Sequence, residues 1–367
     1  MKKLLAAVLL CAFALPASAV RKVTVAELDR ILADKHKPSD SLLADILTDV
    51  ELTERCSAAC LARFESLYPG KMTHDALVSL AGSSAFLSLP ASELPPDPAP
   101  SMEEQRRIVK LAVGYVVKTL PQLPNFLAER QTVNYESPLP ETRAASYLRF
   151  TTTPADARPT RVVARSVTYV AYRDGHEILD PSLPPKRSFR EKLLAPSASG
   201  ALHRLTSNGE FGPILNLIVY DAPKGSIVWS HWERNSAGLE AHFSFTVFPA
   251  NSHFHVDFPC GSSDTAHYPA YHGEFAVDPA TGAILRLALS GTLADPCPPV
   301  SSSIVTEYGP VQIGGRTYIC PLHSVSISLI PPLGPNAAKA ELNDVLFTGY
   351  HLFRAETRIL PASDSQP

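Results

Sequence analysis

The hydrophobic pattern of the chain changes its period once. Between residues 20 and 89, apolar side chains recur every three or four positions, as at Leu28, Ile31 and Leu32. This spacing predicts short helices that each bury one stripe. Residues 90–100 then hold five prolines and predict a stiff linker. Ser101 and Glu104 form a capping box at the start of the strongest predicted helix.

From about residue 128 the apolar period becomes two, which is typical of strands with one buried face. Some ten to twelve such runs are separated by turn signals such as Asp174-Gly175. The densest stretch is 206–256, where the runs 214–220, 227–234 and 240–248 follow one another. We therefore predict an α+β fold: a large, curled, half-barrel-like antiparallel sheet with a covering helix, preceded by a small helical region.

The predicted organisation has five parts: a signal peptide over 1–19, a helical region over 20–89, a linker over 90–100, a helix-plus-sheet domain over 101–361, and a flexible tail over 362–367. Two lysines, an apolar run and small residues before Ala19 indicate a cleaved leader. The run is shorter than the roughly 20 residues of a membrane-spanning helix, and no later run could span a membrane. We expect a periplasmic or extracellular protein.

Composition narrows the classes of partner. Hydrophobic residues make up 45% of the chain, charged residues 19%, and the net charge is −3. This suits a globular core, and the absence of a basic block argues against a nucleic-acid partner. The 34 prolines argue against a long helical bundle, because proline breaks helices.

Five cysteines follow the predicted leader, which suggests a disulfide in an oxidising compartment. Cys56 and Cys60 would be four residues apart on a helix, where they are poorly aimed for a disulfide. We expect instead a pair drawn from Cys260, Cys297 and Cys320.

One candidate metal site lies in the alternating run 253–257. Side chains two apart on a strand share a face, and two imidazoles with a carboxylate suit Zn²⁺ or non-haem Fe²⁺. The alternative, which the intervening apolar residues favour, is the ordinary polar face of a half-buried strand; no cofactor is then expected. The candidate ligands are His253, His255, Asp257, His272 and Glu274.

A second candidate lies in residues 229–233 (WSHWE). On an ideal strand, Trp229, His231 and Glu233 share one face, which could bind a polar ligand or let Glu233 act as a base. The alternative is cross-strand pairing, which aromatic and charged residues commonly make. The candidate ligand-binding residues are Trp229, His231, Trp232 and Glu233.

Several motifs together resemble a family of uncharacterised secreted bacterial proteins. They are LPQLPNF (120–126), SNGEFG (207–212), WSHWE (229–233), YHGE (271–274), EYGPV (307–311) with IGG (313–315), and LNDV (342–345). That family has no assigned activity to carry over. The order of one helix, a long sheet and a late Asn-Asp-Val strand also resembles the architecture of periplasmic lipoprotein-carrier (LolA-like) half-barrels. This second resemblance implies a curved sheet, covered by helices, that holds an acyl chain.

The common catalytic motifs are missing: there is no Gly-x-Ser-x-Gly elbow, no His-Glu-x-x-His and no phosphate loop. We therefore predict a non-catalytic binding or carrier-like protein that holds a lipid or another apolar ligand. One alternative is a metal-dependent enzyme that uses the strand carrying His253. The other is a scaffold that docks an envelope protein through its N-terminal helices.

Overall fold

The computed structural model describes residues 20–33, 38–138, 160–179, 205–235, 238–258, 266–293, 300–330 and 338–353. The predicted leader over 1–19, Cys260, Cys297 and the predicted tail over 362–367 lie outside these ranges. Among the described residues, no helix is both long and apolar enough to cross a membrane.

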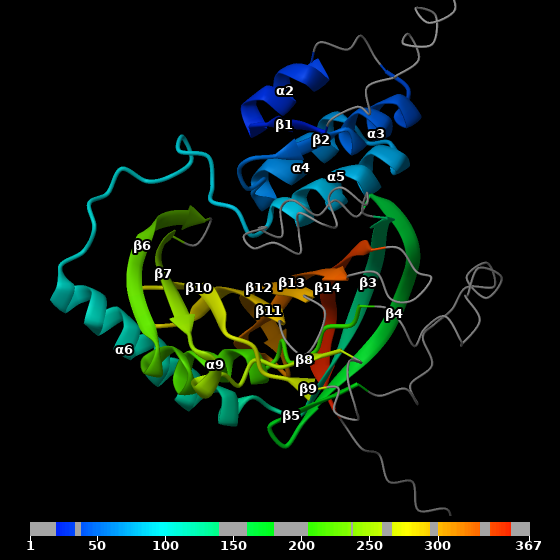
Figure 1. The fold of residues 1–367 in the computed structure, drawn as a ribbon. Coiled ribbons are helices and arrows are strands. Elements are labelled where there is room, and N and C mark those ends of the chain that lie inside the picture. Colours follow the sequence, from blue (N-terminus) through cyan, green and yellow to red (C-terminus); the bar gives the residue numbers. More distant parts are fainter. Residues whose placement is uncertain are drawn as a thin grey trace, which may run out of the picture.

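Ten antiparallel strands form one sheet in the order β5-β4-β3-β14-β13-β12-β11-β10-β7-β6. The sheet curves strongly but stays open, with β6 and β5 at its two edges (Figure 1). The predicted α+β class with a large antiparallel sheet is therefore confirmed. The strands are β3 (Phe126–Pro138), β4 (Arg161–Arg173), β5 (His176–Leu179), β6 (Ser226–Asn235), β7 (Gly238–Val247), β10 (Tyr271–Val277), β11 (Ile284–Leu293), β12 (Val300–Ile313), β13 (Arg316–Ile330) and β14 (Lys339–Leu352).

The N-terminal helices cover one face of this sheet (Figure 1). They are α2 (Val25–Ala33), α3 (Asp40–Thr48), α4 (Ala58–Leu67) and α5 (Lys71–Ser84), and a short parallel pair, β1 (Arg21–Val23) with β2 (Val50–Leu52), lies among them. They bury a core of their own that includes Leu28 and Phe64. Helix α5 also packs on the sheet, where its Val78 joins a cluster with Val325 and Leu342.

The opposite face is covered by α6 (Met102–Thr119) and α9 (Pro213–Tyr220) (Figure 1). The Ser101 side chain caps α6 by accepting a hydrogen bond from the Glu104 backbone N–H at 3.2 Å, as predicted. Ile108 of α6 and Ile218 of α9 are fully buried against the sheet. The sheet is thus sandwiched between two helical layers.

Helix α9 corrects the expectation of a strand over 214–220. Its run is almost uniformly apolar, and such a run carries no period that distinguishes a buried strand from a buried helix. Pro213 stands in the first turn, where a helix tolerates proline because that N–H needs no partner. Four of its side chains are buried, so contact with both α6 and the sheet favours the helix.

Three short 3-10 turns and one small hairpin complete the described chain. They are η2 (Leu120–Gln122), η5 (Ala222–Lys224), η6 (Pro249–Asn251), and β8 (Val256–Asp257) paired with β9 (Ala266–His267). The predicted proline linker runs past β6, where the Pro98 carbonyl accepts a hydrogen bond from Trp232 Nε1 at 2.9 Å.

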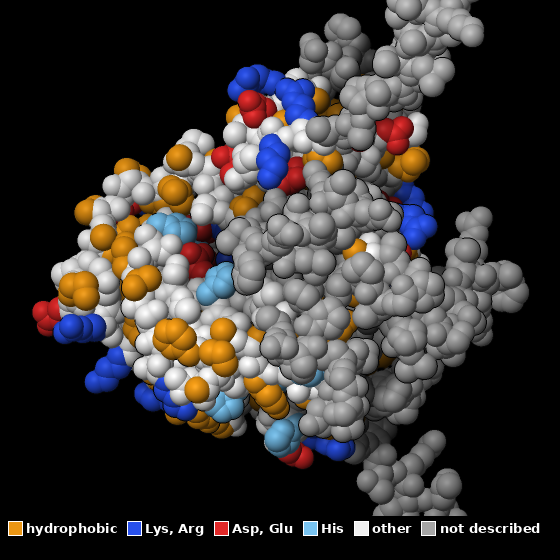
Figure 2. Space-filling view, in the orientation of Figure 1, with side chains coloured by type: hydrophobic (Ala, Val, Ile, Leu, Met, Phe, Trp, Pro, Cys, Tyr) orange, Lys and Arg blue, Asp and Glu red, His pale blue; other side chains and the backbone are white. Residues whose placement is uncertain are grey.

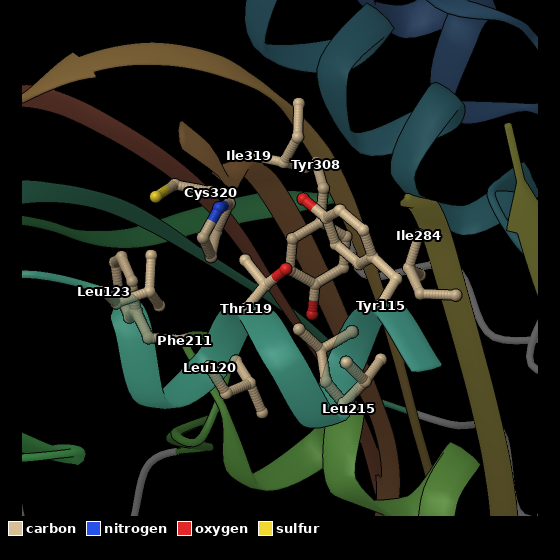
Figure 3. Close-up of a pocket in the computed structure, with 12 residues that line it drawn as sticks. Tyr115, Thr119, Leu120, Leu123, Phe211, Leu215, Ile284, Tyr308, Ile319 and Cys320 are labelled. Carbon is tan, nitrogen blue, oxygen red and sulfur yellow. The ribbon is translucent and has the colours of Figure 1, made fainter. Parts of the chain in front are cut away.

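The apolar layer between α6, α9 and the sheet is well filled. A cavity in this layer measures about 20 Å³, which is room for roughly one water molecule. Figure 3 shows Tyr115, Leu215 and Tyr308 among the side chains that converge on it. A cavity of this size cannot hold an acyl chain.

Candidate functional site

A cluster of histidine and glutamate side chains lies on the polar face of β6, β7 and β10. It comprises His231 and Glu233 on β6, His242 on β7, and Glu274 on β10, with one potential ligand atom of each within 4.8 Å of the others. Figure 2 shows histidine and acidic side chains together over this end of the sheet, in a recess below the N-terminal helices. We call these four residues the His–Glu cluster.

The strand period places His242 in the cluster. Phe243 and Phe245 point into the core between sheet and α6, so His242 must face the other side. In the antiparallel register, Phe275 pairs with Phe243, which sets Glu274 on the same face as His242 and diagonal to it. The His242 side chain is fully buried there.

A β-bulge in β6 corrects the predicted sharing of faces. Trp229 pairs with Phe243 and Trp232 with Ala241, so two residues, not one, lie between the tryptophans opposite a single residue of β7. Both indole rings therefore lie on the core side, 4.8 Å apart between centroids. His231 and Glu233 remain together on the polar face, without the tryptophans.

Hydrogen bonds link the cluster into a chain. His231 Nε2 lies 2.8 Å from Glu233 Oε1, and its Nδ1 lies 2.7 Å from the Ser230 hydroxyl oxygen. The same hydroxyl donates to Glu274 at 3.1 Å, and Glu274 Oε1 lies 3.1 Å from His242 Nδ1. The two imidazole rings stack with centroids 4.6 Å apart. Ser230 thus holds one imidazole and one carboxylate in position.

One nitrogen of the cluster lacks a hydrogen bond within the described part of the chain: His242 Nε2. The nearest carboxylate oxygens, on Glu233 and Glu240, are 3.5 Å away. A buried nitrogen without a partner is costly, and such groups often mark a position that a ligand completes.

Two arginines approach the carboxylates, one from the N-terminal part of the chain and one from the sheet. Arg55, in the loop after β2, contacts both carboxylate oxygens of Glu233, and both side chains are nearly buried, at 8% and 9% exposure. On β11, Arg286 Nη1 lies 3.8 Å from Glu274 Oε1. The cluster therefore lies where the sheet meets the N-terminal helices.

The surrounding charges keep both glutamates ionised. Burial alone raises the pKa of Glu233, but the hydrogen bond with His231 and the charge of Arg55 outweigh it and lower the pKa to about 2. Burial also raises the pKa of Glu274, yet the hydrogen bond and charge of His242 lower it to about 2. For His242, burial lowers the pKa, but the nearby carboxylates of Glu240, Glu274 and Glu233 raise it above its ordinary value. At neutral pH the cluster offers two anionic carboxylates.

The five residues predicted as metal ligands do not come together. Residues 252–255 are not in a strand, and only Val256–Asp257 pairs, yet the expected alternation of faces holds: Phe254 and Phe258 are buried, and the three predicted ligands lie on the other side. His253 is hydrogen-bonded to the buried Asp221 through its ring nitrogen Nδ1 and through its backbone N–H. His255 and Asp257 are exposed, and His272 lies on β10 outside the cluster. Of the five, Glu274 alone belongs to the group.

Four residues around the site were not singled out from the sequence. His242 had a signal, because Glu240, His242 and Ser244 alternate with core phenylalanines. On an ideal strand Ser230 would lie on the face opposite His231 and Glu233, and only the bulge brings it to them. Arg55 and Arg286 lie in other parts of the chain, and no local spacing of residues predicts their contacts with Glu233 and Glu274.

The disulfide differs from the expectation for Cys56, Cys60 and Cys320, whereas a pairing of Cys260 with Cys297 lies outside the described residues. Cys56 and Cys60 are bonded, with Cα atoms 5.4 Å apart, and Cys320 is a free buried thiol. Helix α4 begins only at Ala58, with Ser57 as its cap, so Cys56 lies before the helix and can reach Cys60. The bond cross-links the segment that directly follows Arg55.

No protein-family model, curated protein or solved structure matches the chain. The resemblances drawn from its motifs stay predictions, and the function is argued from the geometry of the site.

Proposed function

We propose that the protein binds one divalent transition-metal ion, such as Zn²⁺, through the His–Glu cluster. The observation that carries this proposal is the convergence of two imidazoles and two carboxylates from three strands within 4.8 Å. Nitrogen and oxygen ligands of this kind suit Zn²⁺ and other first-row divalent ions.

The surroundings of the cluster support the same function. Both carboxylates are anionic at neutral pH, and His242 Nε2, which has no hydrogen bond among the described residues, would ligate an ion once it releases its proton. Ser230 would act from outside the ligand set, orienting His231 and Glu274 as outer hydrogen bonds do in metal sites. Since the side chains of His231 and Glu274 are 22% and 24% exposed, an ion has a route from solvent.

Zinc titration of the purified chain, against a chromophoric chelator, tests the proposal. We expect one Zn²⁺ per chain in the wild type. His231→Gln and Glu274→Gln should weaken binding by at least roughly 100-fold, the upper end of what an outer-shell residue costs. The matched control is His255→Gln, an exposed histidine outside the cluster that should bind as the wild type does. Absence of stoichiometric binding in the folded wild type, or equal loss in the control, would contradict the proposal.

Export of the protein is supported by one observation. The Cys56–Cys60 bond suits an oxidising compartment, as the predicted leader does. Fractionation of cells that express the full chain tests export: recovery in the periplasm or medium is expected, and retention in the cytoplasm would refute it.

Lipid carriage and docking to an envelope protein stay predictions from the sequence. The cavity of about 20 Å³ under α6 and α9 gives lipid carriage no support, because it has room for roughly one water molecule. Mass spectrometry of lipids extracted from purified protein tests it, and no bound lipid is the outcome that would end it.

A further inference from the structure

Arg55 holds an unusual position in the His–Glu cluster. One of its nitrogens, Nη2, contacts both carboxylate oxygens of Glu233. A cation placed between the two oxygens of a carboxylate occupies the position that a metal ion takes when the carboxylate binds it through both oxygens. The guanidinium therefore stands where the proposed ion would bind.

An ion bound through both oxygens of Glu233 would compete with Arg55 for the same place. An Arg guanidinium stays charged at any ordinary pH, and a dication a few ångströms away would repel it in a site where both side chains are less than 10% exposed. Binding of an ion in this way would therefore displace Arg55 from that carboxylate.

The backbone around Arg55 is anchored, so its departure is a movement of the side chain. The Arg55 backbone N–H donates to the Ser88 carbonyl at 2.8 Å, and the Cys56 backbone N–H donates to the Ser84 hydroxyl at 3.1 Å. The disulfide to Cys60 cross-links the same segment. The helical unit can therefore keep its fold while the Arg55 side chain exchanges partners.

A second carboxylate is within electrostatic reach. Burial raises the pKa of Glu307 on β12, but its hydrogen bond with His323 and several positive charges, Arg55 among them, lower it overall. The Glu307 side chain is 47% exposed, and its Oε2 lies 3.8 Å from His323 Nδ1, so this carboxylate is already paired and only adds negative charge to the region that Arg55 would enter.

From this arrangement we infer that Arg55 is a built-in competitor of the metal ion, which sets the affinity of the site and ties the N-terminal helices to the sheet until an ion displaces it. The inference rests on the proposed function, since it needs an ion that binds Glu233. It assigns regulation of that same site to a residue from another part of the chain.

The test compares Zn²⁺ affinity of the wild type with Arg55→Met in the full chain. If Arg55 occupies Glu233 nine-tenths of the time, its removal should tighten binding by about tenfold, because apparent affinity scales with the competent fraction. A purely structural ion pair predicts unchanged or weaker binding instead. The matched control is Arg63→Met, an exposed arginine paired with Asp29 in the same helical unit, which should leave affinity unchanged.

The outcomes separate the two claims. If neither wild type nor variant binds Zn²⁺, the proposed function fails. If both bind and Arg55→Met binds no tighter, the inference fails while the proposed function stands.

A second readout uses the wild type alone, in case the variant does not fold. Phenylglyoxal should modify the nearly buried Arg55 slowly without Zn²⁺ and faster with it, as read by mass spectrometry. Equal modification with and without bound Zn²⁺ would overturn the inference.

Discussion

Removal of the Glu233 charge should destabilise the fold far more than removal of its partner Arg55. Within the described residues, Glu233 is the carboxylate that Arg55 contacts, and the Arg55 side chain is 8% exposed. Glu233→Gln therefore leaves a nearly buried guanidinium without a counter-charge, a change that costs about 3–5 kcal/mol. Arg55→Met leaves Glu233 its hydrogen bond with His231, so the expected cost is about 1–2 kcal/mol.

The double variant measures the coupling between the two residues. With both charges gone, Arg55→Met/Glu233→Gln should cost less than the sum of the single variants, by at least roughly 2 kcal/mol. Urea unfolding at pH 7 followed by circular dichroism gives each free energy, with a chelator present so that no ion contributes. Additive costs, or a Glu233→Gln variant within about 1 kcal/mol of wild type, would refute a strong buried pair.

Three further predictions concern other parts of the fold. Burial and the neighbouring Glu210 carboxylate raise the pKa of Glu177 to about 7, so the free energy of unfolding should fall as pH rises from about 4.5 to 7. Glu177→Gln should abolish this fall, a difference of up to about 3 kcal/mol above pH 7. An unchanged pH profile in the variant would contradict the prediction. Burial lowers the pKa of His323, but the charge of Asp344 and their hydrogen bond outweigh it and raise the pKa to about 10. The contribution of this pair to stability should therefore be full below pH 6.5 and be lost from there to pH 10 in thermal melts; a His323→Gln variant with the same decline as the wild type over that range would refute this. Ile218→Ala should cost about 2–5 kcal/mol in urea unfolding, because the side chain is fully buried, whereas a cost below about 1 kcal/mol would mean that α9 is not seated in the core.

The sheet could be predicted from the sequence because alternation is a local signal. The expected strand over 227–234 lies within β6, and the capped helix after Ser101 is α6. Strand pairs joined by tight turns, such as β12 and β13 around Gly314-Gly315, also follow from local turn chemistry.

The wrong predictions of secondary structure, strand faces and disulfide pairing concern features that the local sequence pattern does not determine. The apolar run of α9 has no period, so only its packing between α6 and the sheet decides that it is a helix. The bulge between Trp229 and Trp232 inserts one residue and reverses the faces after it, which no alternation rule anticipates. The helix start at Ala58 freed Cys56 to pair with Cys60.

Part of the candidate site could be predicted from the sequence. His231 and Glu233 were candidates in one predicted site and Glu274 in another. The spacing of residues along the chain does not reveal which strands are neighbours in the sheet. Sheet topology places β7 between β6 and β10 and so brings both groups to His242. The contact of Arg55 with Glu233 spans 178 residues of sequence, and it depends on how the N-terminal helices dock.

A crystal structure of the chain grown with Zn²⁺, with diffraction data collected at the zinc absorption edge, tests the central claim most directly. We predict one anomalous peak per chain, about 2.0–2.2 Å from ligand atoms of His231, Glu233, His242 and Glu274, with Arg55 turned away from Glu233. An ordered cluster without a peak, or a peak at His253 and His255 alone, would contradict the proposed site.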